Sequence, residues 1–145
     1  MTTEKRNITV LYRGAPPPTY QSEGAAGCDI VAAEDAVVPA GQWAVVPTGF
    51  HIEIPDGYEC QVRSRSGLAA KHGIFVLNSP GTIDPDYRGE IRVILGNSSV
   101  SDFIVKKGDR VAQLVFAPII RATFREVQEF SPTARGDRGF GSTGL

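Results

Sequence analysis

The stretch PAGQWAVVPTGFHIEIPDG, residues 39–57, decides the fold class that we expect for this chain. It holds two short runs rich in β-branched residues, at positions 43–46 and 50–54. A turn signal stands at each outer end, PAG at 39–41 and PDG at 55–57. Short strands separated by such turns are typical of sandwiches, jelly rolls and small barrels. The stretch therefore predicts an all-β fold.

The same pattern continues in both directions from this stretch. Further runs of this kind occupy residues 8–11, 73–77, 90–95, 103–105 and 111–116. We find no sign of the long helices that parallel βαβ units need. One exception is SGLAAKHG at 66–73, which predicts a short helix capped by Ser66 and closed by Gly73. The Gly-rich polar stretch 131–145 predicts a flexible tail.

Composition narrows the class of function. The 145 residues suit a single domain, and a formal net charge of −1 argues against a nucleic-acid or membrane partner. A small anionic substrate stays possible, because local arginines can bind it. No apolar run approaches the length of a membrane span, and the first residues lack the apolar core of a secretion signal. Cys28 and Cys60 are isolated, which is typical of the reducing cytoplasm.

Two stretches in the first half of the chain could contact phosphate. In GAAGCDI, residues 24–30, Asp29 is either an ordinary strand-edge residue or a carboxylate held near a magnesium-bound phosphate. In RSRSGLA, residues 63–69, Arg65 and Ser66 begin the expected helix, whose free N–H groups suit an anion. Gly67 would let a ligand approach the backbone. The alternative for this second stretch is a plain capped helix with an exposed arginine.

Two later stretches combine polar groups with strands. NSPGTIDPDYRG, residues 78–89, reads as a β-hairpin with a long tip, and an ordinary turn is the alternative. Its tip offers a carboxylate, an amide and an aromatic ring, at Asp84, Asn78 and Tyr87. In GDRVAQLVF, residues 108–116, the Gln113 amide lies among apolar residues. If the amide is buried, it needs a hydrogen-bond partner. The alternative is an exposed glutamine on an edge strand.

The tail contains the fifth stretch, RGDRGFGSTG, at residues 135–144. It places Phe140 between glycines, with arginines and hydroxyls nearby. Such a segment is either disordered or able to fold over a ligand, stacking the ring on a base and surrounding phosphate with donors. The Walker A pattern of P-loop proteins is absent from the sequence.

In this order and at this spacing, the five stretches resemble the five motifs of the trimeric deoxyuridine triphosphatase (dUTPase) family, from about Tyr20 to Gly144. The segments GTID at 81–84 and GFGSTG at 139–144 are the most specific. The resemblance implies a jelly-roll-like β-barrel domain over residues 1–130. It also implies a mobile tail, residues 131–145, that closes over the active site. It further implies a homotrimer in which each of three shared sites draws motifs from more than one chain.

The resemblance also implies a reaction, the hydrolysis of dUTP to dUMP and pyrophosphate. This reaction supplies dUMP for thymidylate synthesis and keeps uracil out of DNA. Asp84 matches the general base that activates a water for in-line attack on the α-phosphorus. Mg²⁺ is the implied cofactor, and Asp29 would reach it through water only.

Substrate contacts follow from the same resemblance. Asn78 and the backbone at Thr82 and Ile83 would read the uracil edge, and Tyr87 would pack beneath the deoxyribose. Phe140 would stack on the uracil, and Arg135 would meet the terminal phosphates. The other substrate-binding positions are Arg65, Ser66, Gly67, Arg92, Gln113, Gly141, Ser142 and Thr143.

Two departures from the family pattern stand out. Ser64 replaces the usual proline, which would loosen the start of the helix without removing a ligand group. Arg138 replaces a small residue, and its charge either aids phosphate binding or hinders ordering of the tail. Two other functions stay open, a dCTP deaminase of the same fold and a nucleotide-sensing module without turnover. Asp84 and the complete tail argue against the sensing module. The deaminase would need a glutamate motif that we do not find.

Overall fold

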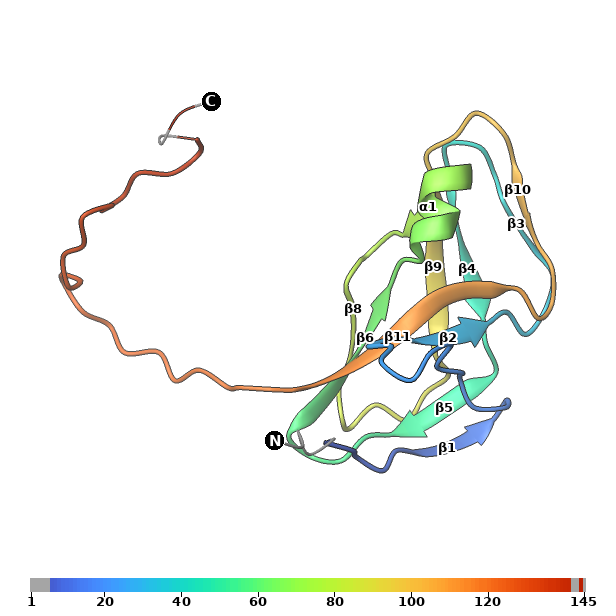
Figure 1. The fold of residues 1–145 in the computed structure, drawn as a ribbon, viewed down its shortest axis with the longest axis horizontal. Helices are drawn as coiled ribbons and strands as arrows, with labels where there is room; N and C mark the ends of the chain where they lie inside the picture. Colours follow the sequence, from blue (N-terminus) through green and yellow to red (C-terminus); the bar gives the residue numbers. More distant parts are fainter. Residues whose placement is uncertain (1–5, 142–143, 145) are drawn as a thin grey trace.

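The structure is a computed structural model that describes residues 6–141 and residue 144, and it consists mainly of short strands (Figure 1). Within the described residues one helix, α1 (Ser66–His72), lies between β6 and β7. The strands, in chain order, are β1 (Leu11–Gly14), β2 (Cys28–Val31), β3 (Ala36–Val38), β4 (Trp43–Pro47), β5 (Phe50–Glu53), β6 (Tyr58–Arg63), β7 (Ile74–Val76), β8 (Gly81–Ile83), β9 (Arg92–Asn97), β10 (Phe103–Val105) and β11 (Arg110–Pro118).

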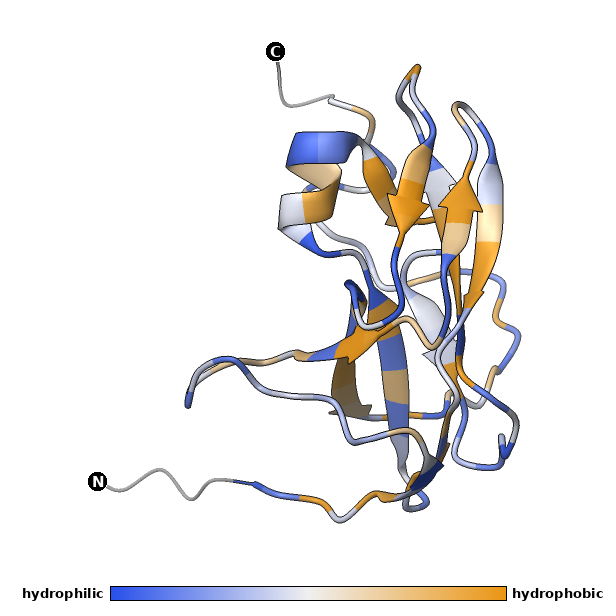
Figure 2. Ribbon diagram, turned by 90° about the vertical axis from the view of Figure 1, so that its right-hand side faces the viewer, coloured by the Kyte–Doolittle hydropathy of each residue, from blue (hydrophilic) through white to orange (hydrophobic). Residues whose placement is uncertain are grey.

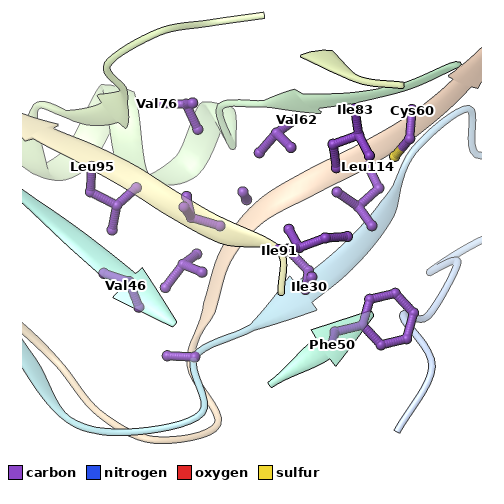
Figure 3. Close-up of a cluster of buried hydrophobic side chains, with 14 of the residues drawn as sticks. Ile30, Val46, Phe50, Cys60, Val62, Val76, Ile83, Ile91, Leu95 and Leu114 are labelled. Atoms are coloured by element: carbon purple, nitrogen blue, oxygen red, sulfur yellow. The ribbon is translucent and has the colours of Figure 1, made fainter. Parts of the chain in front are cut away.

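The strands form four antiparallel sheets. The largest has the order β2-β11-β6-β8, the second has the order β4-β9-β7, and β1-β5 and β10-β3 form two further pairs. Buried side chains of the two larger sheets, among them Val46, Leu95, Ile30 and Leu114, gather in one interior (Figure 3). The all-β, jelly-roll-like prediction is confirmed, although no sheet of the described residues closes into a continuous barrel.

Alternation along the strands places the core and leaves polar groups outside it. In β2, for example, Cys28 and Ile30 are buried, whereas Asp29 and Val31 are partly exposed. Figure 2 shows apolar residues concentrated in the strands. Among the described residues, no helix is long and apolar enough to cross a membrane.

Most of the expected strands occur where the sequence predicts them, but the first does not. The run at 8–11 predicts a strand, whereas β1 begins only at Leu11, because its pairing with β5 joins Leu11 to Glu53 and Gly14 to Phe50. All of β1 is exposed, so its bounds depend on the pairing with β5 and not on burial of alternate side chains. A hydrophobic pattern in the sequence therefore cannot predict these bounds. The strands β3, β6 and β8 have no counterpart among the expected runs.

The helix is confirmed, but its cap is not the expected one. Gly73 ends α1 in the left-handed region at φ 66°, where a side chain would be strained. At the other end Arg65 is the N-cap residue, with φ −91° and ψ 128°, and no side chain caps the helix. The prediction that Ser66 is the cap is therefore wrong, because Ser66 lies one position inside the helix.

The chain leaves the sheets after β11. Figure 1 shows the segment beyond Pro118 running away from all the strands. This segment exposes three large apolar side chains almost completely, at 96% for Ile120, 95% for Phe124 and 90% for Phe130. The domain boundary at residue 130 stays a prediction.

Candidate active site

Asp29 lies at the centre of a charged group that we call the acid–arginine cluster, formed by Asp29, Arg65, Arg110 and Gln113. Its Oδ1 lies 3.4 Å from Arg65 Nε, and its Oδ2 lies 3.2 Å from Arg110 Nη1. The Asp29 side chain is only 12% exposed, so solvent screens these pairs less than it screens surface pairs. Arg65 Nη1 also donates to the Arg110 carbonyl at 3.3 Å, which joins the two arginines.

Gln113 belongs to the same cluster because strand register places it there. On β11 it pairs with Asp29 of β2 on one side and with Arg63 of β6 on the other. The edge-strand alternative is therefore wrong, since β11 is a central strand. The Gln113 Nε2 donates a hydrogen bond to the Ser64 carbonyl at 3.0 Å. A Cβ at Gly27 would lie 2.5 Å from Gln113 Oε1, so only glycine leaves room for this amide.

Ser64 has a structural role that the sequence does not reveal. Its Oγ accepts a hydrogen bond from the Val76 N–H at 2.8 Å, and Val76 is only 1% exposed. The hydroxyl therefore joins the start of α1 to β7 and satisfies a buried donor. Whether Ser64 makes the start of the helix looser than a proline would stays a prediction.

The acid–arginine cluster suits an anion. Two guanidinium groups face one carboxylate, and Ser66 and Gly67 are exposed beside them at the start of α1. Arg110 is a member for which the sequence predicts no role. Only the register between β2 and β11 could have identified it, because Asp29 and Arg110 are distant in sequence.

The predicted long-tipped hairpin is found only in part, because its tip contains a strand that belongs to another sheet. β7 and β9 are antiparallel neighbours, and their connection includes β8, which pairs with β6 instead. A cavity of about 450 Å³ opens beside this connection, a size that suits a small molecule. Five predicted binding positions line this hairpin cavity, namely Asn78, Thr82, Ile83, Tyr87 and Arg92.

The Tyr87 ring is fixed at the cavity wall. Its hydroxyl donates to the Glu90 carbonyl at 2.8 Å, and its backbone N–H donates to the Asp84 carbonyl at 3.1 Å. A side chain at Gly89 would overlap the Tyr87 ring, so glycine is required for the ring to lie there. The ring therefore needs little reordering when a ligand binds.

Asp84 directly follows β8, between the cavity residues Ile83 and Tyr87. Its side chain is exposed, and within the described part of the chain no basic group forms an ion pair with it. Asp84 is not itself among the residues that line the cavity, although its chain neighbour Ile83 is. An exposed, unpaired carboxylate can orient a water and accept its proton.

The loop that connects β8 to β9 is bonded to β5 and to the turn before it. Glu90 Oε2 accepts from the Gly49 N–H at 2.9 Å, and Arg88 Nη2 lies 3.0 Å from Glu53 Oε1. Glu90 Oε1 also lies 3.0 Å from Arg92 Nε, which holds Arg92 at the cavity. The pKa of Glu90 is lowered, chiefly by the hydrogen bond from Gly49 and then by Arg92. Glu90 is a support for the site that the sequence analysis missed.

One chain does not bring the five stretches together. β2 and β8 lie at opposite edges of the four-stranded sheet. Three strand steps of about 4.8 Å and a register offset of four residues at about 3.3 Å each place Asp29 and Asp84 on the order of 20 Å apart. Phe140 is fully exposed on the detached tail, together with Arg135 and Gly141. Ser142 and Thr143 lie outside the described residues.

The donor set fits magnesium only indirectly. Within the described residues, no three His, Cys, Asp or Glu side chains are grouped so that they could hold a metal ion. Both Asp29 oxygens already face arginines, so this carboxylate is poorly placed as a direct ligand. It can still accept a hydrogen bond from a metal-bound water. The residues therefore suit Mg²⁺ carried by the phosphates of a ligand, since Mg²⁺ commonly retains several waters.

Comparison with known proteins gives consistent results. Residues 13–144 match the protein family described as dUTPase. The deoxyuridine 5'-triphosphate nucleotidohydrolase of Zymomonas mobilis is 53% identical, over 97% of this chain and 98% of that protein. The enzyme of the same name from Nautilia profundicola is 52% identical, over 97% of this chain and 99% of that protein.

Solved structures agree with the sequence comparisons. The dUTPase of Staphylococcus bacteriophage 80alpha with dUpNHpp has a TM-score of 0.87 at 28% identity, over 96% of this chain and all of that one. A mutant dUTPase from phage phi11 of S. aureus, solved with a structural Mg(II) ion, has a TM-score of 0.78 at 26% identity. That match covers 85% of this chain and 99% of the phage protein.

Proposed function

This chain belongs to the dUTPase family and hydrolyses dUTP, and we propose that Asp84 is the general base of that reaction. One observation carries the proposal. Asp84 is an exposed carboxylate without an ion-pair partner among the described residues, and it directly follows in the chain Ile83, one of the residues that line the hairpin cavity. It would take a proton from a water that attacks the α-phosphorus, and pyrophosphate would leave on the opposite side.

The edge of β8 supports recognition of uracil. β8 is the last strand of its sheet, so the backbone groups on its outer side are available to a ligand. The edge of uracil offers one hydrogen-bond donor between two acceptors. The backbone groups of a strand edge and the Asn78 amide together can form hydrogen bonds with all three. Cytosine presents a different donor and acceptor pattern, so its binding would leave polar groups unpaired. Thr82 and Ile83 supply this edge.

The Tyr87 ring supports selection of the sugar. Two hydrogen bonds and the space left by Gly89 hold the ring against the cavity wall. A ring fixed in this way would pack beneath a deoxyribose and collide with a 2′-hydroxyl. UTP would therefore be a poor substrate.

The acid–arginine cluster supports phosphate binding on a second surface. Arg65 and Gln113 would donate to phosphate oxygens, with Ser66 and Gly67 beside them at the start of α1. Magnesium, when bound to the phosphates, would neutralise charge there, and Asp29 would hold one of its waters. Arg92, held by Glu90, would contribute from the cavity side.

We infer a homotrimer with shared sites because one chain leaves the contributing groups apart. Asp29 of the acid–arginine cluster lies on β2 and the hairpin cavity opens beside β8, and these are the two edge strands of one sheet. The detached segment beyond Pro118 carries Phe140 and the exposed Ile120, Phe124 and Phe130, which a neighbouring chain would cover.

The expected location is the cytoplasm, where the free, buried Cys28 and Cys60 stay reduced. Burial raises the pKa of Cys60 to about 12, so this thiol is unreactive.

A pyrophosphate-release assay with dUTP, dCTP, dTTP and UTP tests the proposal. We expect release from dUTP, at least about a hundredfold faster than from the others, because each mismatch leaves a polar group unpaired or a methyl or hydroxyl without room. Ammonia released from dCTP would instead identify a deaminase. Tight dUTP binding without turnover would identify a sensing module.

A further inference from the structure

The tail segment from Thr133 to Arg138, here called the tail turn, keeps its shape through hydrogen bonds of its own. Arg135 Nε donates to the Arg138 carbonyl at 2.7 Å, and Arg138 Nε donates back to the Arg135 carbonyl at 3.0 Å. Arg138 Nη2 also donates to the Ala134 carbonyl at 2.8 Å. Gly136, at φ 61°, donates from its N–H to Thr133 Oγ1 at 3.0 Å. Each arginine therefore supports the backbone from which the other projects.

These bonds leave guanidinium nitrogens available for a ligand. Among the described residues, no acceptor lies within hydrogen-bond distance of the Arg135 terminal nitrogens or of Arg138 Nη1. With Asp137 as its acid, the tail turn carries a net charge of +1. Guanidinium groups form strong, charge-assisted hydrogen bonds to phosphate. Two of them held in one turn can contact neighbouring phosphates of a polyphosphate chain.

We propose that Arg138 is a second phosphate-binding residue of the tail, presented together with Arg135 by the preformed tail turn. The ligand is the terminal phosphate pair of a nucleoside triphosphate, so this inference rests on the proposed function. A turn that is already held by hydrogen bonds loses less conformational entropy on closing than an unstructured chain does. The charge of Arg138 thus aids binding, and the same side chain orders the turn.

The test compares three full-length variants with the wild type, Arg138→Gly, Arg138→Lys and Arg125→Gly. Arg125 is the matched control, because it is an exposed arginine of the segment beyond Pro118 that lies outside the tail turn. The readouts are kcat and KM for dUTP at low and high salt, and the inhibition constant of inorganic tripolyphosphate. Each variant keeps Asp84 and the core, so failure to fold is not expected.

For Arg138→Gly we expect KM and the tripolyphosphate inhibition constant to rise about three- to tenfold at low salt, with kcat at saturation nearly unchanged. The rise shrinks at high salt. Arg138→Lys recovers part of the loss, since it keeps the charge but not the forked donors. Arg125→Gly behaves as the wild type.

Two results would overturn the inference. The first is an Arg138→Gly KM equal to that of the wild type at low salt. The second is an equal rise in Arg125→Gly, which would assign the effect to the overall charge of the tail. Either result leaves the proposed function intact as long as the wild type releases pyrophosphate from dUTP. A wild type that releases none would contradict the proposed function itself.

Discussion

The loop from Asp84 to Ile91 and the tail beyond Pro118 are proposed to serve the same reaction, yet they are ordered by different means. The loop is bonded to the folded domain through Gly49 and Glu90, and through Glu53 and Arg88. The tail turn is bonded only to itself among the described residues. Folding alone therefore orders the loop proposed to contact the sugar and the acid–arginine cluster proposed to contact phosphate. The tail residues proposed to contact the base and the terminal phosphates are not held by the described part of the domain.

The largest expected effect comes from the folded side of this comparison. Asp84→Asn should lower kcat for dUTP by roughly 10³- to 10⁴-fold, because the amide cannot accept the proton of the attacking water. Binding of dUTP should stay nearly the same, since the amide keeps the shape of the carboxylate. Steady-state kinetics and calorimetric titration measure the two quantities. Unchanged turnover would refute the assignment of Asp84 as the base.

Removing the tail should have the next largest effect. A chain that ends at Ala134 should lose about 10²-fold in kcat/KM, as expected when donors to the phosphates are removed. Its melting temperature should match that of the full chain, because the removed residues that the structure describes contact no part of the core. Thermal unfolding and kinetics on the same preparation separate the two effects. A truncated chain with the full rate would show that the tail has no part in the reaction.

A smaller effect is expected where α1 begins. Ser64→Ala removes the acceptor of the buried Val76 N–H, and the free energy of unfolding should fall by about 1–2 kcal/mol. Ser66→Ala is the matched control, because Ser66 caps nothing and its loss should change stability by less than about 0.5 kcal/mol. Denaturant unfolding measures both variants. Equal losses would contradict the assignment of the bond to Ser64.

The smallest effect concerns Glu90 and depends on pH. The folded-state pKa of Glu90 is lowered, so its ionised form stabilises the fold above its ordinary pKa of 4.5, and this contribution disappears as pH falls through the lowered value. Glu90→Gln should therefore be less stable than the wild type near neutral pH. The difference should vanish in acid. Melting temperatures across this pH range measure it, and a constant difference would contradict the assignment.

The sequence predicts the cavity well because its residues are neighbours in the chain. Asn78, Thr82, Ile83 and Tyr87 lie in the connection between β7 and β9, Arg92 begins β9, and the structure places all of them around one cavity. Local spacing also predicts α1 and the glycine that ends it.

Sheet order could not be predicted in the same way. Nothing in the sequence near Asp29 indicates Arg110 as its partner, because their contact follows from the register of β2 against β11. The separation of Asp29 from Asp84 likewise follows from β8 pairing with β6. The error at Ser66 is of another kind. A helix boundary shifted by one residue changes which side chain can serve as the cap.

A mixing experiment tests most directly the proposal of shared sites, in the form in which Asp84 and the tail of one site come from different chains. One partner is the full-length Asp84→Asn chain, and the other is the chain that keeps Asp84 but ends at Ala134. Each alone should be nearly inactive. After they are unfolded and refolded together, we predict dUTP hydrolysis well above the sum of the two, because mixed trimers contain sites with both Asp84 and a tail. Activity equal to that sum, in a sample shown to contain mixed trimers, would contradict the account.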